Sequence, residues 1–311
     1  MEFADFQLAA ERTDQTPAGK NEDLKSIVIP LLGLAGESGS LLTEYKKYLR
    51  DGDAYQLFHE RISEELGDIL WYLANIATKA GLDLEEIARR NLSKTTDRWH
   101  EQSSPLFGPK LFDDGYPHFE QFPRKFEITV STIQSSDGKA RVQLFYEGRR
   151  FGDQLGDNAY EDDGYRLHDV FHLSYLAILG WSPVLRKLFN CKRKSNREVD
   201  ENEDGGRANV IDEAISALVF TEAKKHSYFE GVDSVEYQVL RTIKDLTAHL
   251  EVRRCSAKQW ERAILEGFRI WRILRTHGNG KIIGDLIAST INFVPEESGG
   301  ASSLPKIAGQ A

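Results

Sequence analysis

Apolar residues recur every three or four positions through the first hundred residues, which is the spacing of one face of an α-helix. Glycine and aspartate mark turns between the helical stretches, as at Asp51-Gly52-Asp53 and Gly81. Asp83 stands at the expected N-cap of the last helix. Because short loops favour antiparallel neighbours, this pattern predicts an all-α bundle. Its helices are expected at about 3–12, 24–49, 54–79 and 83–100.

The pattern changes after residue 101. Proline and glycine recur through residues 102–124, which predicts a linker. Apolar and polar residues then alternate along 126–130 and again along 140–146, and Asp137-Gly138 between them predicts a small β-hairpin. Helical spacing resumes and continues to about residue 276. The helices of this region are expected at 165–179, 184–189, 210–225, 235–250 and 257–276.

A mainly α protein with two domains is therefore predicted. The first is the helical bundle of residues 1–101, and the second is a mainly helical domain of residues 125–294 that contains the hairpin. Residues 295–311 are rich in serine, glycine and glutamate and are expected to be a disordered tail.

The amino-acid composition excludes several classes of binding partner. The 311 residues carry 40 Lys+Arg against 49 Asp+Glu, a formal net charge of -9, which argues against a nucleic-acid or anionic-membrane binder. The two cysteines, Cys191 and Cys255, form no CxxC pair. No apolar run approaches the roughly 20 residues of a membrane helix, and the first residues lack the features of a signal peptide. A cytoplasmic location is expected.

Carboxylates gather on two helices that are predicted to face each other. Glu37 follows the small, apolar run Gly33–Gly36, and Glu65 and Asp68 share one face of the next helix, with Glu64 adjacent. Clustered carboxylates repel one another, and a divalent cation removes that repulsion. Oxygen-only ligation suits Mg²⁺ or Mn²⁺. The alternative is that these acids are ordinary solvated positions.

A polar face follows on the fourth predicted helix. Asn91, Lys94 and Arg98 recur at spacings of three and four, which places an amide, an ammonium and a guanidinium on one side. Such groups suit the oxygens of a polyphosphate. An ordinary exposed polar face would look the same.

Three of these segments together resemble the MazG-like family of all-α nucleoside triphosphate pyrophosphohydrolases. The resemblance rests on Leu32–Glu37, Glu64–Leu73 and Asn91–Lys94, in that order, and covers about residues 1–100. It implies cleavage of a nucleoside triphosphate, with ribose or deoxyribose, to the monophosphate and pyrophosphate. It also implies a homo-oligomer and a role in controlling or sanitising nucleotide pools.

The resemblance assigns roles to single residues. Glu37, Glu65 and Asp68 match the family's metal ligands, and Glu64 is a candidate for orienting or deprotonating the attacking water. Lys94 and Arg98 would stabilise phosphate charge, with Asn91 beside them, and Tyr72 is a candidate to stack on the base. The list of expected site residues is thus Glu37, Glu64, Glu65, Asp68, Tyr72, Asn91, Lys94 and Arg98.

Ser40 departs from the family pattern, which has a second glutamate there. A hydroxyl is a neutral, weak ligand, and Glu44 lies about 6 Å further along the helix, too far for direct replacement. Three alternatives follow: the site holds fewer metals, it bridges one through water, or it binds nucleotides with little turnover. The last alternative makes the bundle a nucleotide sensor that regulates the second domain.

The second domain resembles the C-terminal domain that accompanies some MazG-type proteins, which implies no particular activity. His168 and His172 are four residues apart, so both imidazoles lie on one helical face and can chelate a metal. An acid would complete the site, and the candidates are Asp169, Asp162, Asp163 and the pair Asp212-Glu213. The alternative is that both are hydrogen-bonded interior histidines. The basic run 192–197 is predicted to be a solvated loop or a phosphate-binding edge.

Overall fold

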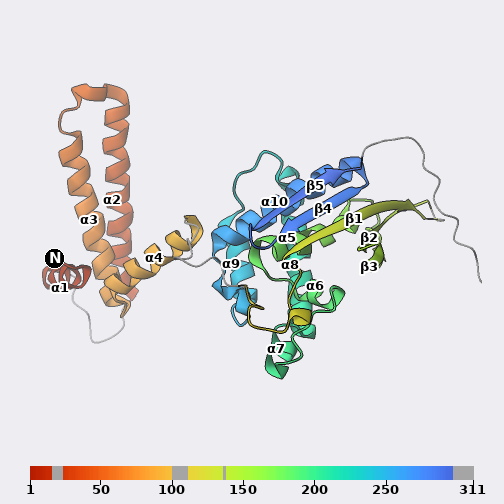
Figure 1. The fold of residues 1–311 in the computed structure, drawn as a ribbon. Coiled ribbons are helices and arrows are strands. Elements are labelled where there is room, and N and C mark those ends of the chain that lie inside the picture. The colour runs from red at the N-terminus through yellow and green to blue at the C-terminus, as the bar shows by residue number, and fades with distance from the viewer. Residues whose placement is uncertain (16–23, 100–110, 136–137, 297–311) are drawn as a thin grey trace, which may run out of the picture. The chain divides into compact units, whose positions relative to one another are not determined.

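The computed structural model describes residues 1–15, 24–99, 111–135 and 138–296. The chain divides into two compact units, Met1–Thr96 and Asp97–Ala311. Helix is the predominant secondary structure, as the sequence predicts (Figure 1).

The first unit contains the four predicted helices. α2 and α3 lie side by side as a long hairpin, joined by a 3-10 turn at Gly52–Ala54 (Figure 1). Asp83 caps the fourth helix, since its Oδ1 accepts hydrogen bonds from the backbone N–H groups of Glu85 and Glu86 at 2.8 and 3.3 Å. The bounds are α1 Phe3–Thr13, α2 Leu24–Asp51, α3 Phe58–Lys79 and α4 Leu84–Trp99, of which the last residues from Asp97 belong to the second unit.

Gln7 fastens α1 to the start of α4. Its side-chain amide donates to the carbonyl of Leu82 at 2.9 Å, and its Oε1 accepts from the backbone N–H of Leu84 at 2.7 Å. Trp71 on α3 adds a second tie, because its Nε1 donates to Thr13 Oγ1 at 2.8 Å. Trp71 also packs against the small buried core of this unit.

The hydrophobic core of this unit is small. Its buried members are largely alanines, while leucines along α2 remain exposed, such as Leu42 at 70% and Leu49 at 84%. By length and composition alone, the segment Ser26–Ala54 passes the test for a membrane-crossing helix, contrary to the expectation that no run is long enough. This is weak evidence for a membrane, and the same segment carries Glu37 and Glu44 on the side that faces α3.

The second unit combines helices with a five-stranded antiparallel sheet in the order β3-β2-β1-β4-β5. The predicted hairpin is confirmed as β1 and β2, although Asp137 of its turn lies outside the described residues. The bounds of the strands are β1 Lys125–Gln134, β2 Ala140–Tyr146, β3 Arg149–Leu155, β4 Gly280–Asp285 and β5 Thr290–Pro295. The bounds of the helices are α5 Asp169–Leu179, α6 Pro183–Leu188, α7 Arg197–Asn202, α8 Gly206–Lys224, α9 Tyr237–Leu246 and α10 Ala257–His277.

The core of the second unit lies between the sheet and α5 and α10. Ile128 on β1 pairs with Ile282 on β4, and both side chains are fully buried together with those of α5. α5 is buried along its whole length, which explains its continuous apolar run. Both cysteines, Cys191 and Cys255, are also buried here.

Residues 111–124 belong to this core, and so they correct part of the predicted linker. Leu111 and Phe122 are buried in it, and Asp113 accepts ion-pair contacts from Arg124 and Arg186 at 2.7 and 3.1 Å. Residues 100–110 of the predicted linker, and 297–311 of the predicted tail, lie outside the described residues.

The basic run 192–197 is not simply a solvated loop. Arg193 is 1% exposed and pairs with both Asp204 and Glu251 at 2.7 Å. The end of the run starts α7, where Asn196 caps the helix by accepting from the backbone N–H of Val199. The guanidinium of Arg193 is therefore buried and paired with two carboxylates inside the second unit, so it is not available to bind a phosphate.

Candidate metal and nucleotide site

Three of the predicted carboxylates converge between α2 and α3. Glu37 comes from α2, and Glu65 and Asp68 come from successive turns of α3. One carboxylate oxygen of each lies within 4.8 Å of one oxygen of each of the others. Glu37 and Glu65 are half-buried and Asp68 is exposed, so the cluster opens to solvent on one side. Oxygens at this spacing can share one divalent cation.

The cluster is electrostatically unfavourable as it stands. Burial raises the pKa of the Glu65 carboxyl, and the hydrogen bond to Glu37 and the charges of Glu37, Asp68 and Glu64 raise it further. The neighbouring carboxylates therefore disfavour the charged form of Glu65. A cation bound between them would relieve the repulsion, and the donor set fits an oxygen-preferring ion such as Mg²⁺ or Mn²⁺.

Glu64 lies beside the cluster but is not part of it. Its carboxylate pairs with Arg61 at 2.8 Å, and both side chains are about half exposed. An exposed pair of this kind contributes little to stability and opens readily. The Glu64 carboxylate can therefore leave Arg61 at little cost in stability.

Ser40 is half-buried on α2, one turn beyond Glu37. Glu44 does not replace it, because its carboxylate is already engaged: it accepts hydrogen bonds from Tyr55 and, at 2.6 Å, from Lys47. Glu44 is 6% exposed, and these partners lower the pKa of its carboxyl. The missing fourth carboxylate is thus not supplied by the next turn of the helix.

The predicted substrate-binding residues lie on two different helices, Tyr72 on α3 and Asn91 and Lys94 on α4. Tyr72 lies on α3 one turn beyond Asp68, with its ring against Gly33 of α2. Asn91 and Lys94 are exposed on α4. Within the described residues, no hydrogen bond or ion pair joins either of them to the acidic cluster.

Arg98 requires a correction, because it is not on an open face with Asn91 and Lys94. It belongs to the second unit, where its guanidinium pairs with Glu261 at 2.7 Å and donates to the carbonyl of Val235 at 2.8 Å. Arg98 is 7% exposed. Helical spacing placed it with Lys94, but the helix passes from one compact unit to the next between them.

Comparison with known proteins agrees with this division. The profile of the MazG C-terminal domain matches residues 108–297, which is more than half of the chain, and that of the MazG nucleotide pyrophosphohydrolase domain matches residues 31–102. The chain belongs to the MazG family. The gene 37 protein of Mycobacterium phage L5 is 34% identical to this MazG protein over 96 residues, which are 30% of the chain and 84% of the phage protein. No solved structure matches the chain.

The matched pyrophosphohydrolase domain of this MazG protein contains the acidic cluster together with Tyr72, Asn91 and Lys94. The MazG C-terminal domain contains the second predicted group, and the structure gathers it as well: single ligand atoms of His168, Asp169 and His172 lie within 4.8 Å of one another. Both predicted clusters are therefore formed by the fold, one in each unit.

Proposed function

We propose that the first unit hydrolyses nucleoside triphosphates to nucleoside monophosphates and pyrophosphate. The observation that carries this proposal is the convergence of Glu37, Glu65 and Asp68 on one point between α2 and α3, inside the matched pyrophosphohydrolase domain. The substrates would be ribo- or deoxynucleotides, and the activity would control or sanitise nucleotide pools.

Each side chain has a role in the proposed reaction. Glu37, Glu65 and Asp68 would hold Mg²⁺ or Mn²⁺, which would neutralise phosphate charge and make a water more acidic when bound. Glu64, released from Arg61, orients this water and takes its proton as the oxygen attacks the α-phosphorus. The bond between the α-phosphorus and the bridging oxygen breaks, and pyrophosphate leaves. Lys94 and Asn91 contact the phosphates, and Tyr72 contacts the base.

We also infer that the first unit functions as a homodimer or larger assembly. A core built largely of alanines leaves most leucines of α2 in water, which is costly for a single copy. A second copy that covers this face would remove the cost.

The test is pyrophosphate release from a panel of nucleoside triphosphates with Mg²⁺ or Mn²⁺. We expect metal-dependent release by the unchanged protein and a loss of at least about 100-fold in Asp68→Asn, since a metal ligand is removed. Glu60→Gln is the matched control, because Glu60 is an exposed acid on α3 outside the cluster. Equal loss in both variants, or release without a metal, would contradict the proposal.

A second function is favoured by Ser40. With one carboxylate fewer, the unit would bind nucleotides and turn them over poorly, and so act as a sensor. Equilibrium dialysis distinguishes the two: a sensor binds a triphosphate in the presence of Mg²⁺ and returns it intact.

A further inference from the structure

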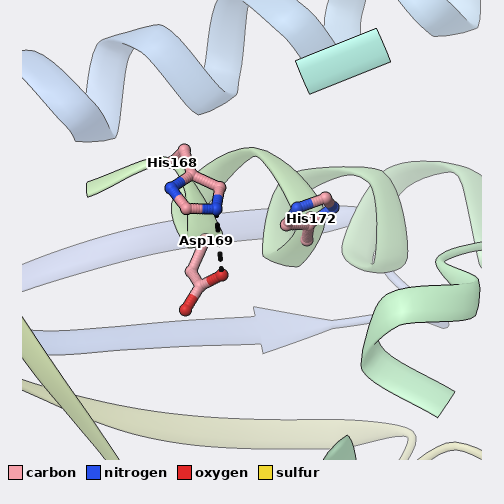
Figure 2. A group of neighbouring side chains, drawn as sticks. All are labelled: His168, Asp169 and His172. Carbon is pink, nitrogen blue, oxygen red and sulfur yellow. Dashed lines mark ion pairs between the residues drawn. The ribbon is translucent and has the colours of Figure 1, made fainter. Parts of the chain in front are cut away.

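We propose that the second unit contains a binding site for a divalent first-row transition ion, formed by the side chains of His168, Asp169, His172 and Glu213. The first three lie at the start of α5 (Figure 2), and Glu213 lies on α8. This site is separate from the acidic cluster of the first unit and does not depend on the proposed hydrolysis.

The hydrogen bonds of the two histidines determine which ring nitrogen is available. His168 Nδ1 lies 2.9 Å from the carbonyl oxygen of Tyr165, and His172 Nδ1 lies 2.8 Å from Asp212 Oδ1. A carbonyl and a carboxylate can only accept, so in both rings Nδ1 carries the proton. In the neutral imidazoles, each Nε2 is left with a free lone pair, which is the form that binds a metal.

Both Nε2 atoms lie close to the carboxylate of Glu213. Glu213 Oε2 lies 3.5 Å from His172 Nε2 and 3.8 Å from His168 Nε2, and Asp169 Oδ1 lies 3.9 Å from His168 Nε2. Ligand atoms about 2.1 Å from a tetrahedral ion are about 3.4 Å apart. The observed separations are slightly longer than this and would close with small side-chain movements.

His172 provides an independent observation. Its side chain is completely buried, and its Nε2 forms no regular hydrogen bond among the described residues, with Glu213 Oε2 lying 3.5 Å away. A buried polar atom without a partner is costly, and native structures rarely keep one without a reason. A metal ion at the point shared with Glu213 and Asp169 would supply the missing partner.

The acidic side chains in this region also favour a bound cation. Asp169, Asp212 and Glu213 lie close together, and in the described part of the chain no lysine or arginine forms an ion pair with any of them. The group therefore contains three carboxyl groups without a lysine or arginine partner, and two of the three belong to buried residues. A divalent ion offsets their charge.

Asp212 positions a ligand and does not itself bind the ion. One of its oxygens accepts from His172, and the other accepts from Ser182 Oγ at 2.6 Å and from the backbone N–H of Val184 at 3.2 Å. A carboxylate behind a ligating histidine fixes the ring and increases its basicity. Tyr165 does the same for His168: its carbonyl holds Nδ1, and its ring stacks on the imidazole at 4.5 Å.

The donor set indicates the class of ion. Two imidazole nitrogens and two carboxylate oxygens suit Zn²⁺, Mn²⁺ or Fe²⁺, whereas Mg²⁺ prefers oxygen ligands and water. Glu213 is about half exposed, so the ion can enter and exchange from that side. The ion would join α5 to α8 and thereby stabilise the second unit.

The competing arrangement contains no metal. Burial by itself lowers the pKa of His172, but Asp212 and Glu213 raise it well above the usual value, so an imidazolium between two carboxylates is the alternative. The two arrangements differ in a measurable way: one binds Zn²⁺, and the other binds no metal.

The experiment uses the full-length, untagged chain. Protein purified without chelator is analysed by elemental mass spectrometry, then stripped with EDTA and titrated with Zn²⁺ calorimetrically in excess Mg²⁺, which occupies the first site. We expect about one transition ion per chain, and at least tenfold weaker Zn²⁺ binding by His168→Gln and Glu213→Gln. The exposed residues His249 and Glu201 provide the matched controls His249→Gln and Glu201→Gln, which should bind as the unchanged protein does.

A melting curve with and without Zn²⁺ gives a second readout. The ion should raise the melting temperature of the unchanged chain and of both controls, but not of the two ligand variants. Glu213→Gln retains the shape of a half-exposed side chain, so it tests the site even if a histidine variant fails to fold. Zn²⁺ binding that is equal in the unchanged chain and in folded Glu213→Gln and His168→Gln, or absent from all of them, would overturn the proposal.

Discussion

The ring of Tyr72 on α3 lies directly against the backbone of Gly33 on α2, so close that a β-carbon at residue 33 would be 2.2 Å from Tyr72 Cε1. This contact lies on the same side of the hairpin as the acidic cluster, because Tyr72 follows Asp68 by one turn and Gly33 precedes Glu37 by one turn. The spacing of α2 and α3 at the carboxylates therefore depends on the absence of a side chain at Gly33.

Replacing Gly33 should separate the two helices. We expect Gly33→Ala to lower the free energy of unfolding of the first unit by about 1–3 kcal/mol, because the ring or the helix must move. Metal binding at the cluster should weaken as well. Gly36→Ala is the control, since a β-carbon there would meet nothing within 4 Å and alanine favours the helix. Thermal melting and Mn²⁺ titration of both variants would check this, and an unchanged Gly33→Ala would contradict it.

The raised pKa of Glu65 predicts a pH dependence with a definite sign. The folded chain keeps a proton that an unfolded glutamate, with a pKa near 4.5, would release. The stabilising contribution is therefore present below pH 4.5 and is lost as the pH rises through the raised pKa. Without metal, Glu65→Gln should become progressively more stable than the unchanged protein from pH 4.5 to 7.

Metal should reverse this difference. Mg²⁺ or Mn²⁺ at pH 7 should raise the melting temperature of the unchanged protein and leave that of Glu65→Gln almost unaltered, because the variant lacks a ligand. Melting curves at several pH values, with and without metal, measure both effects. A difference between the two proteins that does not vary with pH would show that Glu65 carries no raised pKa.

Restoring the missing carboxylate should strengthen the site. Ser40 faces a position that Glu44 cannot reach, since Glu44 is held by Tyr55 and Lys47. We expect Ser40→Glu to bind Mn²⁺ more tightly and to raise pyrophosphate release if the site is limited by its metal. Ser40→Gln is the control for size without charge. If it raises release as much as Ser40→Glu does, the effect is not one of charge.

The exposed leucines of α2 predict the state of assembly. Leu42→Glu and Leu49→Glu introduce charge on the uncovered apolar face, so they should convert an oligomer into a monomer. Light scattering after size-exclusion chromatography measures the mass. Leu246→Glu, at a partly exposed leucine of α9, should leave the mass unchanged. A monomeric unchanged protein would refute the assembly.

Arg98 should matter for stability more than for turnover. Arg98→Ala leaves the buried Glu261 without this partner, and breaking a buried pair costs about 3–5 kcal/mol. The melting temperature of the second unit should fall, while the KM for the nucleotide stays the same in the folded protein. Arg90→Ala, at an exposed arginine of α4, is the control. If Arg98→Ala raises the KM and leaves the melting temperature unchanged, Arg98 contacts the phosphates and the correction is wrong.

The helices and both side-chain clusters could be predicted from local patterns in the sequence. The three-residue spacing of Glu65 and Asp68, and the four-residue spacing of His168 and His172, are properties of one helix and can be read without knowing its neighbours. Asp83 was likewise predicted as a cap because a cap is a local feature.

Relations between distant segments could not be read in this way. β4 and β5 join the sheet only because the chain returns to β1 after about 150 residues, and their short apolar stretches resemble a loop when seen alone. Asp212 and Glu213 are among several candidate acids for a site with the two histidines, and only the fold places this pair against His172. Arg98 has the right helical phase for Lys94, but tertiary burial decides its partner.

The burial of Cys191 and Cys255 makes the chain suitable for selective labelling. Burial raises the pKa of the Cys191 thiol to about 11 and that of the Cys255 thiol to about 12, so almost no thiolate forms at neutral pH. The thiolate is the reactive form. A cysteine introduced at an exposed serine such as Ser93 should therefore react with maleimide probes while both natural cysteines stay unmodified, and a spin label or dye there would report motion of α4 without any prior removal of cysteines.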